Sequence, residues 1–137
     1  MTQDFALDER LAADTEPVAT LALSDLRLMN DARFPWLILV PRRPNATELT
    51  DLDEPDRMRL MAEVAAVSQA LRTATNCDKL NVGALGNIVR QLHIHVVARS
   101  CGDAAWPGPV WGAGEPVAYC AEARDRLIEL IRIALPT

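Results

Sequence analysis

Residues 91–97 read Gln-Leu-His-Ile-His-Val-Val and hold both histidines of the 137-residue chain, His93 and His95. Polar and apolar side chains alternate here, which is typical of a β-strand, whose successive side chains point to opposite faces. Gln91, His93 and His95 therefore share one face, about 7 Å apart from one to the next. Because the flanking residues are apolar and often β-branched, we predict a strand over 88–99.

Segments before this strand predict further strands. Residues 18–29 carry apolar side chains at alternating positions with one change of phase, which indicates two short strands or one bent strand. After a turn at 30–33, residues 36–40 form a continuous apolar run ended by Pro41, as in a strand buried on both faces. Residues 80–85 predict another strand.

Two helices complete the pattern. Asp53 precedes a proline and acidic residues, which is the signature of a helix N-terminus. Apolar residues then follow at helical spacing: Met58, Met61, Val64, Ala65, Val67, Ala70 and Leu71. A second stripe, from about 117 to 134, passes through Leu127, Ile128, Ile131 and Leu135. The order of strands, helix, strands and helix predicts one α+β domain over residues 1–137, with a mainly antiparallel sheet and two main helices.

Composition and charge exclude several classes of function. The net charge is -5 and the only basic doublet is Arg42-Arg43, so no basic stripe could neutralise a long nucleic acid. No glycine-rich segment ends in Lys-Ser or Lys-Thr, which excludes a P-loop. No stretch approaches the roughly 18 apolar residues of a membrane span, and the N-terminus does not resemble a secretory leader. We therefore expect a cytosolic protein without a membrane partner.

The cysteines support the same setting. Cys77, Cys101 and Cys120 are odd in number, widely spaced and free of Cys-x-x-Cys pairs. This pattern favours reduced cytosolic thiols over a disulfide framework or a zinc ribbon.

The row of polar side chains at 91–95 has three interpretations. It is the solvated face of a half-buried strand, or His93 and His95 hold a metal ion together with Cys101 or a carboxylate. In the third interpretation, a neutral imidazole attacks phosphorus while neighbouring groups donate hydrogen bonds to the phosphate oxygens.

Residues 91–97 resemble the signature of the histidine triad (HIT) family of nucleotide hydrolases and transferases, in which three histidines alternate with apolar residues. Upstream, Asn81 and the Gly-Asn-Ile-Val run at 86–89 resemble the Asn or Gln and the Gly-Gln-x-Val that the family places before its triad. Residues 28–31 and 36–42 resemble the family's nucleoside-binding strand pair. The sequence departs from the family pattern at two positions. Glutamine stands at the first triad position. Tryptophan stands at position 36, where the family often has a histidine at the start of the second strand.

The resemblance implies a mechanism. His93 matches the family's nucleophile, whose Nε2 attacks the α-phosphorus of a nucleotide before water hydrolyses the nucleotidyl-histidine. Its other ring nitrogen donates a proton to the backbone carbonyl of Gln91. His95 and Asn87 stabilise charge on the phosphate oxygens. The amide of Gln91 contacts phosphate or orients the leaving group, without acting as an acid or base.

Other residues carry secondary expectations. By the same resemblance Asn30 binds the ribose hydroxyls, Asn81 lies on the phosphate or leaving-group side, and Arg99 attracts a polyphosphate. Each also has a purely structural alternative. Asn30, and similarly Asn81, could serve as a turn residue, and Arg99 could be a solvated residue at the end of the strand. The segment 106–111, Trp-Pro-Gly-Pro-Val-Trp, forms a rigid wall beside a base, or else seals the core or a dimer interface.

The predicted function is hydrolysis or nucleotidyl transfer on a small nucleotide conjugate, such as a dinucleoside polyphosphate, a nucleoside phosphoramidate or an adenylate. Ile88 stands where some relatives carry a hydroxyl that protonates a leaving amine, which weakens the case for phosphoramidates. The resemblance implies a homodimer, and we expect no cofactor and no metal. Two alternatives remain: a nucleotide-binding or sensing protein with weak catalysis, and a metal-binding domain built on His93 and His95.

Overall fold

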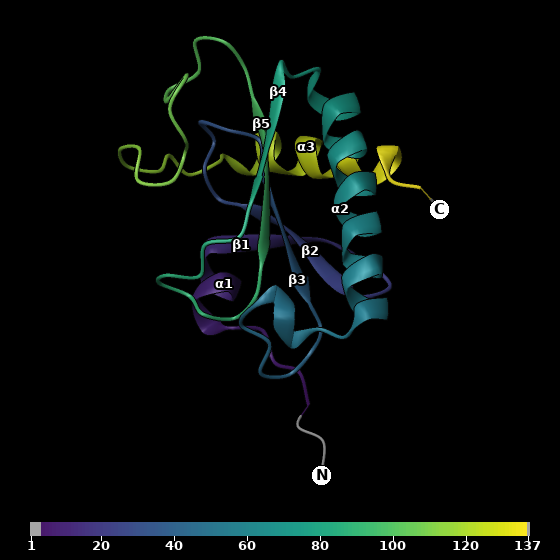
Figure 1. The fold of residues 1–137 in the computed structure, drawn as a ribbon. Coiled ribbons are helices and arrows are strands. Elements are labelled where there is room, and N and C mark those ends of the chain that lie inside the picture. Colours follow the sequence, from purple (N-terminus) through teal and green to yellow (C-terminus); the bar gives the residue numbers. More distant parts are fainter. Residues whose placement is uncertain (1–3, 137) are drawn as a thin grey trace.

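The computed structural model describes residues 4–136, and its centre is a five-stranded antiparallel sheet (Figure 1). The strand order is β1-β2-β3-β5-β4. The strands are β1 (Thr15–Thr20), β2 (Ser24–Met29), β3 (Trp36–Pro41), β4 (Lys79–Gly83) and β5 (Ile94–Arg99). The helices are α1 (Glu9–Asp14), α2 (Glu54–Thr75) and α3 (Ala121–Ala134), with a short 3-10 turn at Leu49–Asp51. The predicted α+β class, with a mainly antiparallel sheet and two main helices, is confirmed.

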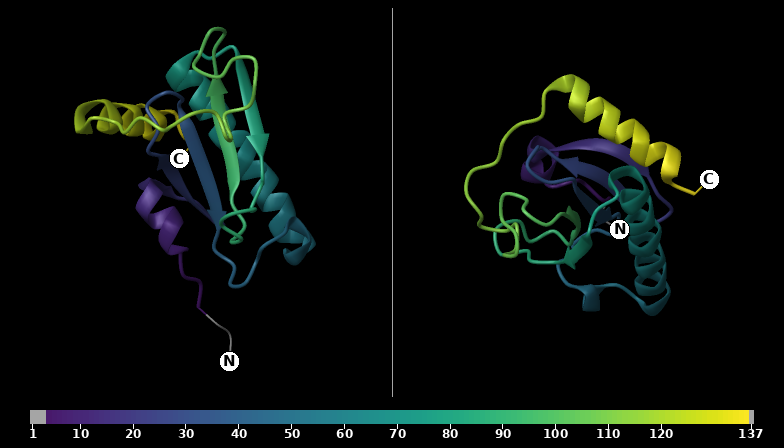
Figure 2. Two further views of the ribbon diagram at one scale, coloured as in Figure 1. Left: turned by 90° about the vertical axis from the view of Figure 1, so that its left-hand side faces the viewer. Right: turned by 90° about the horizontal axis from the view of Figure 1, so that it is seen from above.

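The central strand β3 divides the core into two layers. All six of its residues are buried, as the continuous apolar run predicts. Leu37 and Leu39 face a cluster built with α2 and α3, whereas Trp36 and Ile38 face a second cluster that includes Leu11 of α1. Figure 2 shows α1 and α2 on opposite sides of the sheet. The β3 face that bears Trp36 carries the candidate site.

The last long strand is shorter than predicted. We expected it over 88–99, but β5 begins at Ile94, and residues 84–93 have no regular structure. The pair Gly83–His95 is the last between β4 and β5, and the pair Leu39–Ile94 is the last between β3 and β5. Alternation alone does not make a strand, because a strand also needs a hydrogen-bonding neighbour. Gln91 therefore lies off the sheet.

The helix after Asp53 is confirmed, but its buried stripe is not the predicted one. The Asp53 side chain accepts a hydrogen bond from the backbone N of Asp56 and caps α2. Met58 and Met61 were expected on the apolar face, yet each is 67% exposed. Leu60, Val64, Val67 and Leu71 face the core instead. Leu60, Val64, Val67 and Leu71 follow one another by steps of four, three and four residues and so share one side of the helix, while the two methionines lie on another side.

The C-terminal helix begins later than predicted, at Ala121 rather than near 117. Ile128 and Ile131 are buried against α2, while Leu127 and Leu135 are partly buried. No helix in the described part of the chain is both long and apolar enough to span a membrane.

Candidate active site

The two histidines lie together on the sheet face opposite α2. His95 is the second residue of β5, and His93 directly precedes that strand. Their ring centroids are 4.8 Å apart with the rings inclined at 67°, and both side chains are buried. The structure thus brings the two strongest candidates into contact.

The ring of His93 is oriented by the backbone. Its Nδ1 lies 2.7 Å from the carbonyl oxygen of Gln91. A carbonyl oxygen only accepts hydrogen bonds, so Nδ1 carries the proton and donates it. In a neutral imidazole this leaves the lone pair on Nε2, which is the form a nucleophile needs.

The ring of His95 has the opposite tautomer. The indole Nε1 of Trp36 donates a hydrogen bond to His95 Nδ1 at 2.9 Å. Because an indole nitrogen cannot accept, Nδ1 is bare and Nε2 carries the proton. Burial, aided by the neighbouring His93, lowers the pKa of His95 to about 3. His95 is therefore a neutral ring that donates through Nε2 next to His93.

Two tryptophans form the wall around His95. The ring centroids of Trp36 and Trp111 lie 5.7 Å and 5.4 Å from that of His95, and 6.3 Å from each other. Trp111 Nε1 is buried and has no hydrogen-bond partner among the described residues. Of the two predicted tryptophans, Trp111 lies at the site, while Trp106 stacks over the guanidinium of Arg99.

Arg99 has a different role from the one expected. It is only 1% exposed, so it is neither a solvated strand end nor free to attract a polyphosphate. Its Nε and Nη2 donate to the carboxylate of Asp103, and its Nη1 donates to Asn81 Oδ1. Asp103 also accepts hydrogen bonds from backbone N–H groups, including that of Trp106. The pair holds the loop that leads to Trp111.

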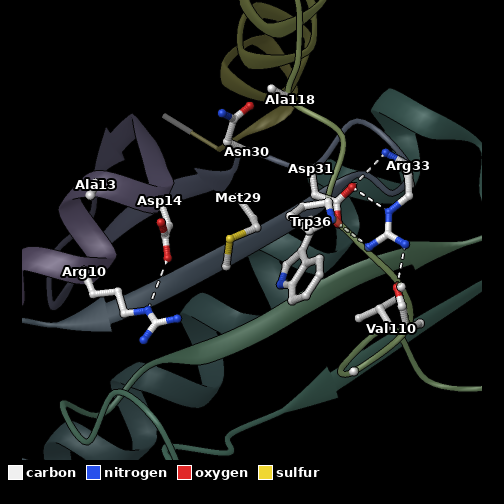
Figure 3. Close-up of a pocket in the computed structure, with 14 residues that line it drawn as sticks. Arg10, Ala13, Asp14, Met29, Asn30, Asp31, Arg33, Trp36, Val110 and Ala118 are labelled. Atoms are coloured by element: carbon white, nitrogen blue, oxygen red, sulfur yellow. Dashed lines mark hydrogen bonds and ion pairs between the residues drawn. The ribbon is translucent and has the colours of Figure 1, made fainter.

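A pocket of 520 Å³ opens beside Trp36 (Figure 3). Its walls come from α1, from the end of β2, from β3 and from the segment 110–118. The side chains of Arg10, Met29 and Trp36 extend into it. An apolar floor with polar groups around it suits a flat heterocycle attached to a sugar.

The polar edge of this pocket includes Asn30, which was expected to contact ribose. Its Oδ1 accepts a hydrogen bond from the backbone N of Tyr119. Next to it, Asp31 is buried and paired with Arg33 through two hydrogen bonds. Burial alone raises the pKa of Asp31, but hydrogen bonds from Arg33 and from the backbone of Val117 outweigh it and leave the pKa lowered. Asp31 stays charged and holds the pocket edge in place.

A second pocket of 400 Å³ borders His93. It is lined by His93, by residues 47–50 and by residues 84–86 and 90–92. His93 lines this second pocket, whereas the first pocket reaches the histidines through Trp36, whose indole bonds to His95. Asp51 accepts hydrogen bonds from Thr47 and from the backbone of Glu48, which fixes the turn along this second pocket.

The remaining candidates are placed less centrally. Asn81 is on β4 and contacts Arg99, with no described contact to either histidine. Asn87 is exposed in the segment 84–93, where it lines a shallow pocket with Glu48 and Arg90. The amide of Gln91 bonds to the backbone of Ala6 and Asp8. It is not free to contact a phosphate in this arrangement.

A metal site receives no support from side-chain placement. Among residues 4–136, no group of three His, Cys, Asp or Glu side chains is arranged to hold an ion. Nδ1 of His95 is already occupied by Trp36. The three cysteines are free thiols in the described structure.

Sequence reasoning missed two residues of the site. In the sequence Trp36 is a departure from the family pattern, and in the structure its indole fixes the tautomer of His95. A signal exists in the pairing of β3 with β5, because Ile38 lies opposite His95 and Trp36 shares the face of Ile38. Asp103 was not considered, since nothing in the local sequence shows that it binds a buried arginine.

Comparisons with known proteins point to one family and one fold. Residues 11–101 match the HIT domain family. A histidine triad protein from Bradyrhizobium japonicum is 48% identical, over 98% of this chain and 100% of that chain, with a TM-score of 0.96. A histidine triad (HIT) protein from Sinorhizobium meliloti is 49% identical over 96% and 97%, with a TM-score of 0.94. A third, from Marinobacter aquaeolei, is 44% identical over 97% of both chains, with a TM-score of 0.94. No curated protein matches the chain.

Proposed function

Since this chain belongs to the HIT domain family, we propose that it transfers or hydrolyses the nucleotidyl group of a small nucleotide conjugate through His93. The observation that carries the proposal is the pair of complementary tautomers, with a bare Nε2 on His93 and a protonated Nε2 on His95. One ring offers an electron pair and its neighbour offers a hydrogen bond. Attack on a phosphate ester or anhydride needs both at once.

The proposed reaction has two steps. His93 Nε2 forms a bond to the α-phosphorus, and the bond from phosphorus to the leaving group breaks, with the electron pair departing on that group. Water or another hydroxyl acceptor then attacks phosphorus and loses its proton to solvent, the phosphorus–nitrogen bond breaks, and the imidazole recovers its lone pair. His95 donates its Nε2 proton as a hydrogen bond to a phosphate oxygen in both steps. Positioned donors of this kind typically contribute about 10²- to 10³-fold to rate.

The two cavities suggest where the substrate lies. The pocket beside Met29 and Trp36 suits the nucleoside, with Asn30 near its sugar. The pocket lined by residues 47–50, 84–86 and 90–92 suits the leaving group, because His93 itself lines it. Dinucleoside polyphosphates, nucleoside phosphoramidates and adenylates are the proposed substrate classes.

Turnover assays with a set of such conjugates test the proposal. We expect the wild type to release nucleoside monophosphate from at least one of them. His93→Asn should lower the rate by roughly 10³-fold or more, because the nucleophile is lost. His95→Gln is the matched control, with a smaller loss of about 10²-fold, since only a donor is removed. Binding without product from any conjugate would reject catalysis and favour a nucleotide-sensing protein.

The assembly and setting of the protein are also proposals. β4 forms one edge of the sheet, and Val82 on this strand is exposed, as are Met58 and Met61 on α2. These features support pairing with a second copy of the chain. Free thiols at all three cysteines are compatible with a cytosolic setting.

A further inference from the structure

Both polar atoms of the Gln91 side chain form hydrogen bonds to the N-terminal segment. Its Oε1 accepts a hydrogen bond from the backbone N of Asp8, and its Nε2 donates to the backbone carbonyl of Ala6, both at 2.8 Å. In an extended chain, a carbonyl and the N–H two residues later point the same way, as they do toward a neighbouring strand. One carboxamide therefore serves as a strand edge for residues 5–8, which we name the N-terminal strap.

The same residue holds the ring of His93. The backbone carbonyl of Gln91 accepts a hydrogen bond from Nδ1–H of His93. No sheet ladder fixes this carbonyl, because residues 84–93 have no regular structure. The next peptide N–H, that of Leu92, donates to the carbonyl of Ala46 at 2.9 Å. The orientation of the carbonyl thus depends on this single backbone bond and on the side-chain anchor of Gln91.

The N-terminal strap is itself tied to the nucleoside pocket. Phe5 and Leu7 pack against the apolar cluster that includes Trp36. Asp8 caps α1, because its side chain accepts a hydrogen bond from the backbone N of Arg10. α1 in turn supplies one wall of the 520 Å³ pocket. A continuous set of contacts therefore runs from that wall through the strap to His93.

We propose that Gln91 is a positioning residue, which fastens the N-terminal strap beside the site and thereby holds His93 in the Nδ1–H tautomer. It takes no part in proton transfer, and its carboxamide is engaged by the strap instead of the substrate. The importance of this tautomer for turnover rests on the proposed function. The contacts themselves do not, so the two claims can fail separately.

Substitution of Asp8 tests the strap without touching the histidines. Its φ of -54° suits proline, so Asp8→Pro removes the N–H that Gln91 binds with little backbone strain. Proline also removes the side-chain cap, which Asp8→Ala removes alone while keeping the N–H. The difference between the two variants therefore reports the bond to Gln91. Gln91→Met, of similar size but unable to bond, tests the other partner.

The readout is the ¹⁵N spectrum of the two imidazoles, which is simple to assign in a chain with two histidines. We expect His93 to lose its pure Nδ1–H pattern in Asp8→Pro and in Gln91→Met, and to keep it in Asp8→Ala. The double variant Asp8→Pro with Gln91→Met should show no further change. We expect kcat to fall by up to about tenfold in the same variants, in line with the loss of one or two hydrogen bonds.

Two results would overturn the proposal. One is a wild-type His93 pattern in Gln91→Met or, should that variant not fold, in Asp8→Pro. The other is an equal effect of Asp8→Pro and Asp8→Ala. If no conjugate is turned over, the spectra still decide the role of Gln91, and only the proposed function fails.

Discussion

His95 is a buried titratable group that folding keeps neutral. Its pKa is lowered to about 3, from 6.5 for an exposed histidine. Between these two values His95 is neutral in the folded protein and protonated in the unfolded chain. The unfolded state then binds more protons, and stability falls as the pH falls. Above pH 6.5 both states are neutral at this residue and it adds no pH dependence.

The corresponding prediction concerns the slope of stability with pH. Just below pH 6.5 and down toward pH 3, His95 should add up to about 1.4 kcal/mol per pH unit to the decrease in unfolding free energy. His95→Gln should remove this contribution, while its side-chain oxygen still accepts the hydrogen bond from Trp36. Denaturant unfolding of both proteins at a series of pH values measures the difference. Equal slopes would show that His95 titrates normally in the folded protein.

At the scale of elements, the loop after β5 depends on a buried ion pair. Arg99 is 1% exposed, and its hydrogen bonds hold the pKa of Asp103 far below its usual range. Asp103 in turn accepts from the backbone of Ser100, Ala105 and Trp106. Without the carboxylate, a buried guanidinium loses its partner and the loop loses its backbone acceptor.

We therefore predict that Asp103→Asn lowers the free energy of unfolding by about 3–5 kcal/mol, the usual cost of breaking a buried pair. Asp125→Asn is the matched control, because the Arg124–Asp125 pair is exposed and should contribute less than about 1 kcal/mol. Hydrogen exchange should also speed up at the amides of residues 100–106 in Asp103→Asn alone. A small, equal effect of both substitutions would contradict this account of the loop.

Helices and strands could be predicted from the sequence where the spacing of apolar residues determines them. The buried run at 36–40 and the capped helix after Asp53 needed only local patterns. The predicted start of β5 was wrong. The alternation of polar and apolar residues extends beyond the region in which β3 and β4 provide hydrogen-bonding partners. The exposure of Met58 and Met61 depends on which side of α2 meets the sheet, and a weak helical stripe does not specify this.

At the scale of the whole molecule, the site is assembled from segments far apart in the chain. α1, the end of β2, β3 and the segment 110–118 surround one pocket, and residues 84–93 border the other. The family resemblance led to His93 and His95 because these residues are close in sequence. It could not reveal the hydrogen bond between Gln91 and the N-terminal strap, or the one between the Trp36 indole and His95. Each of these joins residues more than 50 positions apart.

The central claim is that His93 Nε2 forms a covalent bond to phosphorus. Intact-protein mass spectrometry after brief mixing with a nucleotide conjugate, quenched without acid and followed by peptide mapping, tests it most directly. We predict a nucleotidyl adduct on His93 in the wild type, a weaker one in His95→Gln and none in His93→Asn. Release of nucleoside monophosphate at wild-type rate by His93→Asn, or an adduct on any other residue, would contradict the account.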